Sequence, residues 1–167
     1  MQTEECKGLG FPTMMERGDL QGALALLAPD VVLRGPVARY EFTGIDDVGP
    51  VIGAVQQSFH GLRKVEEYGD AHTLVIRWTA TILGRPAEGT DFFRFNEDGL
   101  VREIVVFIRP FDAVAAAATV IGRRLARRRS RTRGAVTAAL TRPLVGVIRT
   151  GDRMTPGLLG YAAGGQR

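Results

Sequence analysis

The chain has 167 residues, 45% of them hydrophobic and 24% charged, which is typical of an ordinary globular protein with one domain and room for an appendage. The single cysteine, Cys6, excludes a disulfide framework within the chain, and the acidic start "MQTEECKG" lacks the apolar stretch of a secretory signal, so we expect a cytoplasmic protein. The longest apolar run, 113–122, has about half of the roughly 20 residues that a membrane-spanning helix needs.

Charge is distributed unevenly along the chain. Residues 1–111 carry 11 basic and 16 acidic side chains, a net charge of −5, whereas residues 112–167 carry 11 arginines and two aspartates, a net charge of +9. The overall charge of +4 therefore comes from the C-terminal part. This asymmetry predicts two parts with different roles.

The first half of the domain alternates helices with short extended segments. Helices are predicted over 11–17, 20–27 and 45–59, and extended segments over 31–37 and 38–44. Gly18 ends the first helix and Asp19 caps the second. Pro50 lies within the first turns of the third helix, where its missing N–H donor matters least.

From residue 63 the hydrophobic period changes to two, as in strands. Four antiparallel strands are predicted over 63–70, 72–83, 87–95 and 100–108, joined by the turn sequences "GDA", "GRP" and "NEDG". Helices followed by a run of strands predict an α+β fold, in which the helices pack on one face of a curved sheet.

Beyond Pro110 the chain becomes apolar and then basic. The segment "FDAVAAAATVIGRRLARRR" predicts a helix of about five turns, whose last arginines suit the negative end of the helix dipole. We therefore expect a folded domain over 5–111, a basic and apolar helical extension over 112–150, and a flexible glycine-rich tail over 151–167.

Three stretches of the sequence together resemble a known family: "ERGDLQGALALLAPDVVLRGPV", "YEFTGIDDVGPVIGAV" and "GTDFFRFNEDGLVREIVVFIRP". They are similar to the SnoaL-like and ketosteroid-isomerase-like branch of the nuclear transport factor 2-like superfamily, over roughly residues 11–111. The resemblance implies a cone, made of a bent antiparallel sheet wrapped around helices, with a pocket between them. The family includes isomerases, polyketide cyclases and non-catalytic binders, so the fold does not determine the function.

The resemblance also allows a residue-by-residue comparison with the ketosteroid isomerases. These enzymes use a helix tyrosine and the aspartic acid of a D-x-x-R-F strand as an oxyanion hole, and a second aspartate to move the proton. The resemblance places Asp91 at the D-x-x-R-F position, Phe11 at the tyrosine position and Gly35 at the position of the second aspartate. Phenylalanine cannot donate a hydrogen bond and glycine cannot carry a proton. Asp91 is thus the candidate catalytic residue, and whether the protein is an enzyme stays open.

The surroundings of Asp91 follow from strand alternation. Asp91 and Phe93 fall on one face of their strand, and Phe92 falls on the other. A hairpin that turns at Gly84-Arg85 would place Trp78 directly opposite Asp91, and this apolar setting predicts a raised pKa for Asp91. Asp91 is then either a pocket acid that donates to a ligand oxygen, or a carboxyl that is bonded to a neighbour or faces water.

The predicted ligand is a small apolar molecule, for which a steroid- or polyketide-like substrate is one candidate. The residues expected to bind it are Arg34, Tyr40, Trp78, Phe93 and Phe11. Arg34 could hold a carboxylate or a pyrophosphate, but an ion pair with Glu41 or Asp30 is the alternative. We expect neither a cofactor nor a metal, since the two histidines are far apart and no nucleotide-binding glycine loop is present.

Two surface features predict partners. Phe92, on the outer face of the sheet, indicates either a homodimer interface or a surface that the C-terminal helix covers. The stretch 123–133 has seven arginines in 11 residues. The absence of interleaved aromatic residues speaks against nucleic acid, which leaves peripheral docking at an anionic inner membrane face, docking on a protein partner, or a solvated tail.

Overall fold

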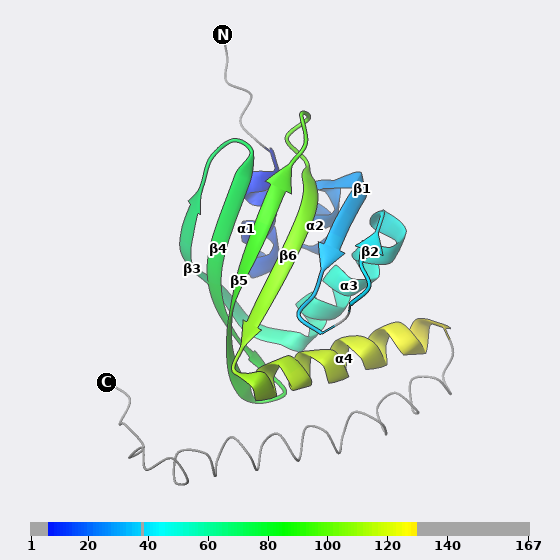
Figure 1. Cartoon of the computed structure of the whole chain (residues 1–167). Coiled ribbons are helices and arrows are strands. Elements are labelled where there is room, and N and C mark those ends of the chain that lie inside the picture. The colour runs from blue at the N-terminus through cyan, green and yellow to red at the C-terminus, as the bar shows by residue number, and fades with distance from the viewer. Residues whose placement is uncertain (1–6, 38, 130–167) are drawn as a thin grey trace.

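The computed structural model describes residues 7–37 and 39–129, and these residues form the α+β cone that the sequence predicts (Figure 1). The elements are the 3-10 helix η1 (Lys7–Gly10), α1 (Phe11–Arg17), α2 (Leu20–Ala25), β1 (Leu27–Arg34), β2 (Phe42–Thr43), α3 (Ile45–Ser58), β3 (Phe59–Gly69), β4 (Thr73–Ile82), β5 (Arg85–Phe95), β6 (Val101–Arg109) and α4 (Phe111–Arg129).

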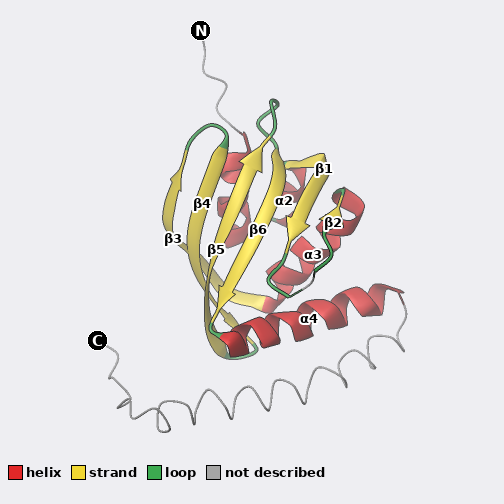
Figure 2. Cartoon of the chain, in the orientation of Figure 1, coloured by secondary structure: helices red, strands yellow, loops and turns green. Residues whose placement is uncertain are grey.

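One curved, open sheet contains the described strands, in the order β2-β1-β6-β5-β4-β3. Neighbouring strands are antiparallel except for β1 and β6, which run parallel, so a strand from the start of the domain lies beside the strand from its end. Helices α1 to α3 lie behind the sheet in the view of Figure 2, and α4 runs across its lower end. The fold class is thereby confirmed.

The predicted bounds of α1 and the predicted start of α2 match the structure. Gly18 ends α1 with a φ of 77°, a conformation in which a side chain is strained. Asp19 caps α2, since its Oδ1 accepts a hydrogen bond of 2.8 Å from the N–H of Gly22. These two residues reverse the chain between the helices.

Several boundaries differ from the sequence prediction; β3, for example, begins at Phe59 and not at residue 63. Helix α2 ends at Ala25, and β1 begins at Leu27, four residues earlier than expected. Leu27 pairs with Val101 of β6, and the N–H of Val101 donates to the carbonyl oxygen of Leu26 at 2.9 Å. This long-range pairing overrides the local helical spacing of the leucines. The predicted segment 38–44 is likewise shorter, with only Phe42–Thr43 in a strand.

The core lies between the inner face of the sheet and the helices. Phe93 of β5 and Ile104 of β6 are among its largest fully enclosed side chains. On the outer face, Phe92 and Phe107 keep 44% and 55% of their surface exposed, with their rings edge to face at 5.9 Å. Helix α4 therefore does not cover Phe92, and pairing with a second copy through this face stays a prediction.

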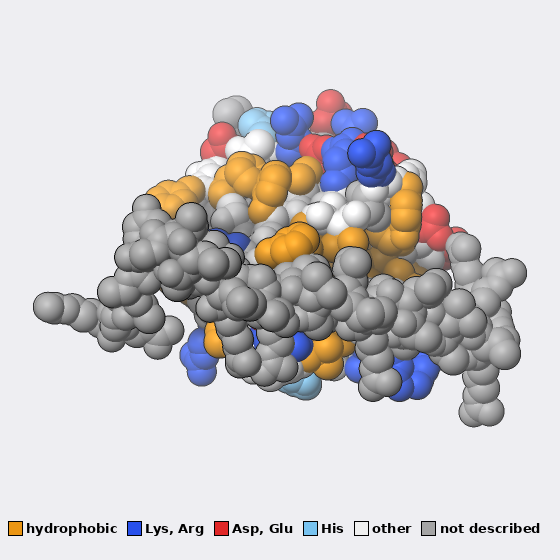
Figure 3. Space-filling view, turned by 60° about the horizontal axis from the view of Figure 1, so that its bottom comes forward, with side chains coloured by type: hydrophobic (Ala, Val, Ile, Leu, Met, Phe, Trp, Pro, Cys, Tyr) orange, Lys and Arg blue, Asp and Glu red, His pale blue; other side chains and the backbone are white. Residues whose placement is uncertain are grey.

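Figure 3 shows hydrophobic side chains interspersed with charged ones on the surface seen from the α4 end.

Helix α4 packs into the same core although the sequence placed the domain end at residue 111. Three of its alanines, Ala113, Ala116 and Ala117, are at most 2% exposed. Near its other end, Arg124 donates hydrogen bonds to Ser58 Oγ at 2.8 Å, to the carbonyl oxygen of Gln57 at 3.2 Å, and to the Gln57 side chain. The predicted features at 134–150 and 151–167, and the last residues of 123–133, lie outside the described residues.

Replacing Arg124 by alanine is expected to lower the free energy of unfolding by about 1–3 kcal/mol, because the buried Ser58 hydroxyl loses its partner. Urea unfolding followed by circular dichroism measures this change. The matched control is Arg123→Ala, which alters an exposed neighbour on the same helix and should stay within about 0.5 kcal/mol of the original chain. Equal losses in the two variants would contradict the anchoring role of Arg124.

Candidate functional site

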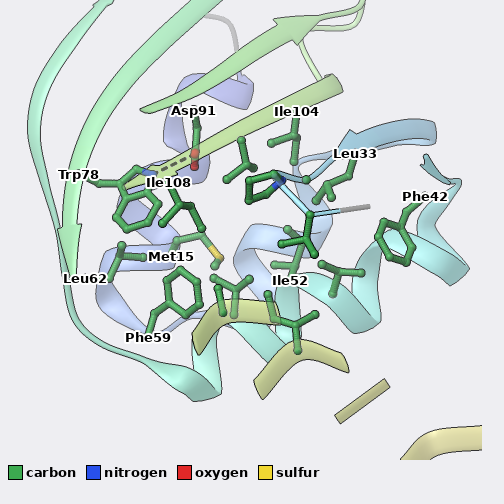
Figure 4. A pocket seen from close by; sticks show the side chains of 18 of the residues that line it. Met15, Leu33, Phe42, Ile52, Phe59, Leu62, Trp78, Asp91, Ile104 and Ile108 are labelled. Atoms are coloured by element: carbon green, nitrogen blue, oxygen red, sulfur yellow. Dashed lines mark hydrogen bonds between the residues drawn. The ribbon is translucent and has the colours of Figure 1, made fainter. Parts of the chain in front are cut away.

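A cavity of about 200 Å³ lies between the inner face of the sheet and the helices (Figure 4). Side chains from α1, α3, α4 and each described strand line it, together with the segment that follows β1. Most of these side chains are aliphatic or aromatic. The lining residues with polar side-chain atoms are Glu16, Tyr40, Lys64, Trp78 and Asp91. An apolar cavity with few polar groups is the usual form of a small-molecule site.

Asp91 and Trp78 form the polar centre of this cavity. The indole Nε1–H of Trp78 donates a hydrogen bond of 2.9 Å to Asp91 Oδ1, drawn as the dashed line in Figure 4. Trp78 is only 3% exposed, and Asp91 is half-buried with its side chain in the cavity lining. The carboxyl group is thus held from one side and open to the cavity.

The register that creates this contact differs from the sequence prediction. Trp78 of β4 pairs with Gly89, and Asp91 pairs with Ile76, so the two functional side chains meet diagonally and not directly opposite each other. The turn consists of Leu83 and Gly84, with φ values of 51° and 74° and the pair Ile82 and Arg85 beside it. Positive φ at both central residues is the geometry of a two-residue hairpin turn that matches the twist of the strands. The expected turn at Gly84-Arg85 was wrong by one residue.

Gly89 makes room for the indole ring. A Cβ atom at residue 89 would lie 2.2 Å from Trp78 Cζ2 and 2.5 Å from the carbonyl oxygen of Phe107, closer than atoms can approach. Only glycine therefore lets the Trp78 ring lie across the β5 backbone and reach Asp91. The sequence reasoning missed this residue, although a glycine within a strand pattern often marks a close approach.

The setting of Asp91 changes its acidity. Burial raises the pKa of Asp91 from 3.8 to about 7, and the hydrogen bond from Trp78 offsets part of that rise. The Trp78 N–H can only donate, so Oδ1 acts as an acceptor and the neutral form carries its proton on Oδ2. Near neutral pH, Asp91 can therefore give a proton to a ligand oxygen or take one from a ligand.

Most of the predicted binding residues come together in the cavity. Phe11 and Phe93 both line it, with ring centroids 5.6 Å apart, and Trp78 lines it as well. Tyr40 also lines it but is 64% exposed, edge-on to Phe42 at 5.1 Å, which is the position of a residue at the mouth.

Arg34 is the exception, since it is not part of the cavity lining. Alternation along β1 turns Leu33 inwards and Arg34 to the other face. There Arg34 forms an ion pair of 2.7 Å with Glu41 and a second one with Glu103. The interpretation of Arg34 as a ligand-binding residue is therefore corrected, and the alternative of an ion pair with Glu41 applies.

Sequence reasoning also missed part of the lining. Helix α4 contributes Ala117, Ala118, Ile121, Gly122 and Leu125. Their spacing along one face of a helix is visible in the sequence. The sequence does not show which part of the domain this helix face packs against. Glu16 was missed as well; its Oε1 accepts a 3.2 Å hydrogen bond from the backbone N–H of Lys64.

A metal site and a membrane-spanning helix are two further features that residues 7–37 and 39–129 could contain. No group of three or more histidine, cysteine, aspartate or glutamate side chains in these residues could hold a metal ion. Among the described helices, none combines the length and the hydrophobicity that a membrane span requires.

Comparison with known proteins identifies the family. The model of the SnoaL-like domain matches residues 10–104, which is more than half of the chain. The chain belongs to the SnoaL-like domain family. No curated protein sequence matches the chain significantly.

Solved structures similar to this SnoaL-like protein include a steroid delta-isomerase from Pseudomonas aeruginosa, 29% identical, with a TM-score of 0.66 over 71% of this chain and 88% of the other. An uncharacterized protein with a cystatin-like fold from Silicibacter pomeroyi is 27% identical, with a TM-score of 0.68 over 79% and 92%. A protein from Cytophaga hutchinsonii described as NTF2-like is 12% identical, with a TM-score of 0.52 over 66% and 96%, and shows the shared fold alone.

The SnoaL-like protein differs from a ketosteroid-isomerase site at two positions that the structure places in the cavity lining. Phe11 and Gly35 both line the cavity with Asp91, but neither can donate a hydrogen bond or accept a proton through its side chain. Of these three positions, only Asp91 therefore has a side chain that can give or take a proton.

Replacing Trp78 by phenylalanine is expected to raise the pKa of Asp91 above about 7, because the N–H donor that favours the carboxylate is removed while the apolar surroundings remain. Carbon-13 NMR titration of the Asp91 carboxyl group measures the shift. The control is Phe59→Leu, which changes the ring packed on Trp78 at 5.7 Å but keeps the indole N–H. A Trp78→Phe variant with an unchanged or lower Asp91 pKa would contradict the assigned hydrogen bond.

The raised pKa also makes stability depend on pH. Between pH 3.8 and about 7 the unfolded chain releases the Asp91 proton while the folded protein retains it, so stability falls as pH rises through this window. The loss approaches about 4 kcal/mol, since one pKa unit corresponds to about 1.4 kcal/mol.

The Asp91→Asn variant should lack this decline and exceed the original protein in stability at pH 8. Urea unfolding at a series of pH values tests this, with Asp98→Asn, an exposed carboxyl in the β5–β6 turn, as the control. A decline of the same size in Asp91→Asn would show that another group causes it.

Proposed function

We propose that the cavity binds a small, mostly apolar molecule with one carbonyl oxygen directed at Asp91. In this proposal Asp91 serves as the acid of an isomerase- or cyclase-like step on a steroid- or polyketide-like compound. One observation carries the proposal: the carboxyl group of Asp91, held by Trp78, has its pKa raised to about 7 in a lining that consists mostly of apolar side chains.

The chemistry of such a site follows from the position of the proton. A neutral carboxyl in an apolar cavity donates a strong hydrogen bond to a carbonyl oxygen and stabilises the negative charge that develops there as an enolate or alkoxide forms. Asp91 gives its proton to that oxygen, and the resulting carboxylate takes up the proton released elsewhere on the substrate. A pKa of about 7 suits both directions of transfer at neutral pH.

The size of the cavity limits the part of a ligand that it encloses. An apolar cavity of roughly 150 Å³ accepts one benzene ring. About 200 Å³ therefore suits one or two rings, and a four-ring steroid would project from the mouth near Tyr40. The similarity to a steroid delta-isomerase at 29% identity supports a cyclic ketone as ligand class.

A second candidate function is ligand binding without turnover. Phe11 and Gly35 favour it, because they supply no partner for Asp91 where the ketosteroid isomerases have a donor and a base. The same cavity and the same hydrogen bond to Asp91 would then hold a ligand for storage or sensing. Membrane docking gains no such support, since Arg124 is hydrogen-bonded to α3.

The variants Asp91→Asn and Asp91→Ala separate these functions. Unsaturated cyclic ketones of one to four rings serve as substrates, and ultraviolet absorbance follows their isomerisation. Asparagine keeps a donor, so Asp91→Asn should bind ketones but lose about 100- to 10,000-fold in turnover, the usual contribution of a general acid or base. Asp91→Ala should lose both binding and turnover.

The Asp98→Asn variant, altered at an exposed turn, serves as the control and should match the original protein. Ketone binding without turnover in the original protein would favour the binding function. Equal binding and equal turnover in the original protein and both Asp91 variants would rule out the role of Asp91.

A further inference from the structure

Helix α4 provides one wall of the cavity although it lies beyond the family match at residues 10–104. Its lining residues are spaced as one face of a helix, at Ala117, Ala118, Ile121, Gly122 and Leu125. In Figure 4 the yellow-green segments of α4 lie beside Phe59 and below Ile52, on the side of the cavity away from Asp91. A ligand anchored at Asp91 therefore extends towards α4.

This wall is held in place along its length. At its start, Asp112 lies 3.5 Å from the guanidinium of Arg85. Ala113 and Ala116 are fully buried against the core, and Arg124 is bonded to Ser58 and Gln57 of α3. Because a closely packed helix does not move aside cheaply, the side chains on its inner face determine how much room the ligand has.

The inner face of α4 combines small and large residues. Ala118 and Gly122 leave space, whereas Ile121 and Leu125 fill it. With the present residues the cavity of about 200 Å³ is larger than the roughly 150 Å³ that takes one ring but too small to enclose three fused rings completely.

We propose that α4 sets the size of the ligand part that the cavity encloses, and that the preferred ligands are apolar ketones with two fused rings. The ketone part of this proposal rests on the proposed function, because it uses Asp91 as the anchor of the carbonyl oxygen. The size limit rests on α4 alone and holds for any apolar molecule in the cavity.

Two substitutions with opposite effects on the cavity volume test the size limit. Ala118→Leu adds atoms to the cavity wall, and Ile121→Ala removes them. The control Ala115→Leu makes the same change as Ala118→Leu at a half-buried position of α4 outside the lining. The probes are benzene and naphthalene, which do not need Asp91, and cyclohexanone, tetralone and a tetrahydrophenanthrenone, which carry the carbonyl group. NMR titration of the full chain gives each dissociation constant.

We expect Ala118→Leu to weaken naphthalene and tetralone binding about tenfold or more while benzene and cyclohexanone change less than about twofold, since each methylene in an apolar pocket is worth roughly 10- to 200-fold. Ile121→Ala should strengthen binding of the three-ring ketone about tenfold. Ala115→Leu should change no probe. If Ala118→Leu does not fold, the gain in Ile121→Ala decides the question alone.

The outcomes separate the two proposals. An unchanged size ranking in Ala118→Leu and Ile121→Ala, or a protein that binds neither hydrocarbon, overturns the role of α4. A size ranking that shifts as expected for the hydrocarbons, with ketones bound no better than hydrocarbons of equal size, supports α4 as the wall and contradicts Asp91 as the carbonyl anchor.

Discussion

The pairing register of β4 with β5 determines what lies in the cavity beside the aromatic side chains. Because Leu83 and Gly84 form the turn, Trp78 lies opposite Gly89, and the indole ring crosses a position where no side chain stands in its way. From there its N–H reaches Asp91 two residues further along the strand. A shift of the register by one residue would turn Trp78 or Asp91 to the outer face. The candidate site thus depends on a turn at the far end of the hairpin.

The apolar lining gives Asp91 its chemical character. A carboxyl group on the surface ionises near pH 4, whereas burial among aliphatic and aromatic side chains raises the pKa of Asp91 to about 7. The single hydrogen bond from Trp78 orients the group but leaves the second oxygen available to a ligand. A second nearby donor would lower the pKa further and remove the proton. Phe11, which also lines the cavity, has no such donor in its side chain.

Local sequence patterns predicted the helices and the four long strands, because turns, caps and alternation act over a few residues. They also placed Asp91 and Phe93 on the inner face, where both line the cavity. They could not predict the early start of β1, which depends on its pairing with β6, a strand more than 60 residues away. Arg34 was misassigned for a related reason: its partner Glu103 comes from that same distant strand. The neighbours that a strand residue meets depend on long-range pairing, which local patterns do not show.

Charge alone did not reveal how the C-terminal helix contacts the domain. The separate role predicted from the arginines of 123–133 stays a prediction, but Arg124 uses its guanidinium to bind α3, and the apolar side of the same helix lines the cavity. Ser58, the partner of Arg124, ends the helix that provides the neighbouring wall. The basic and apolar faces of α4 therefore have complementary effects: Arg124 on one holds the helix in place, and the other limits the volume in front of Asp91. Ligand size and the stability of the C-terminal contact are coupled through this one helix.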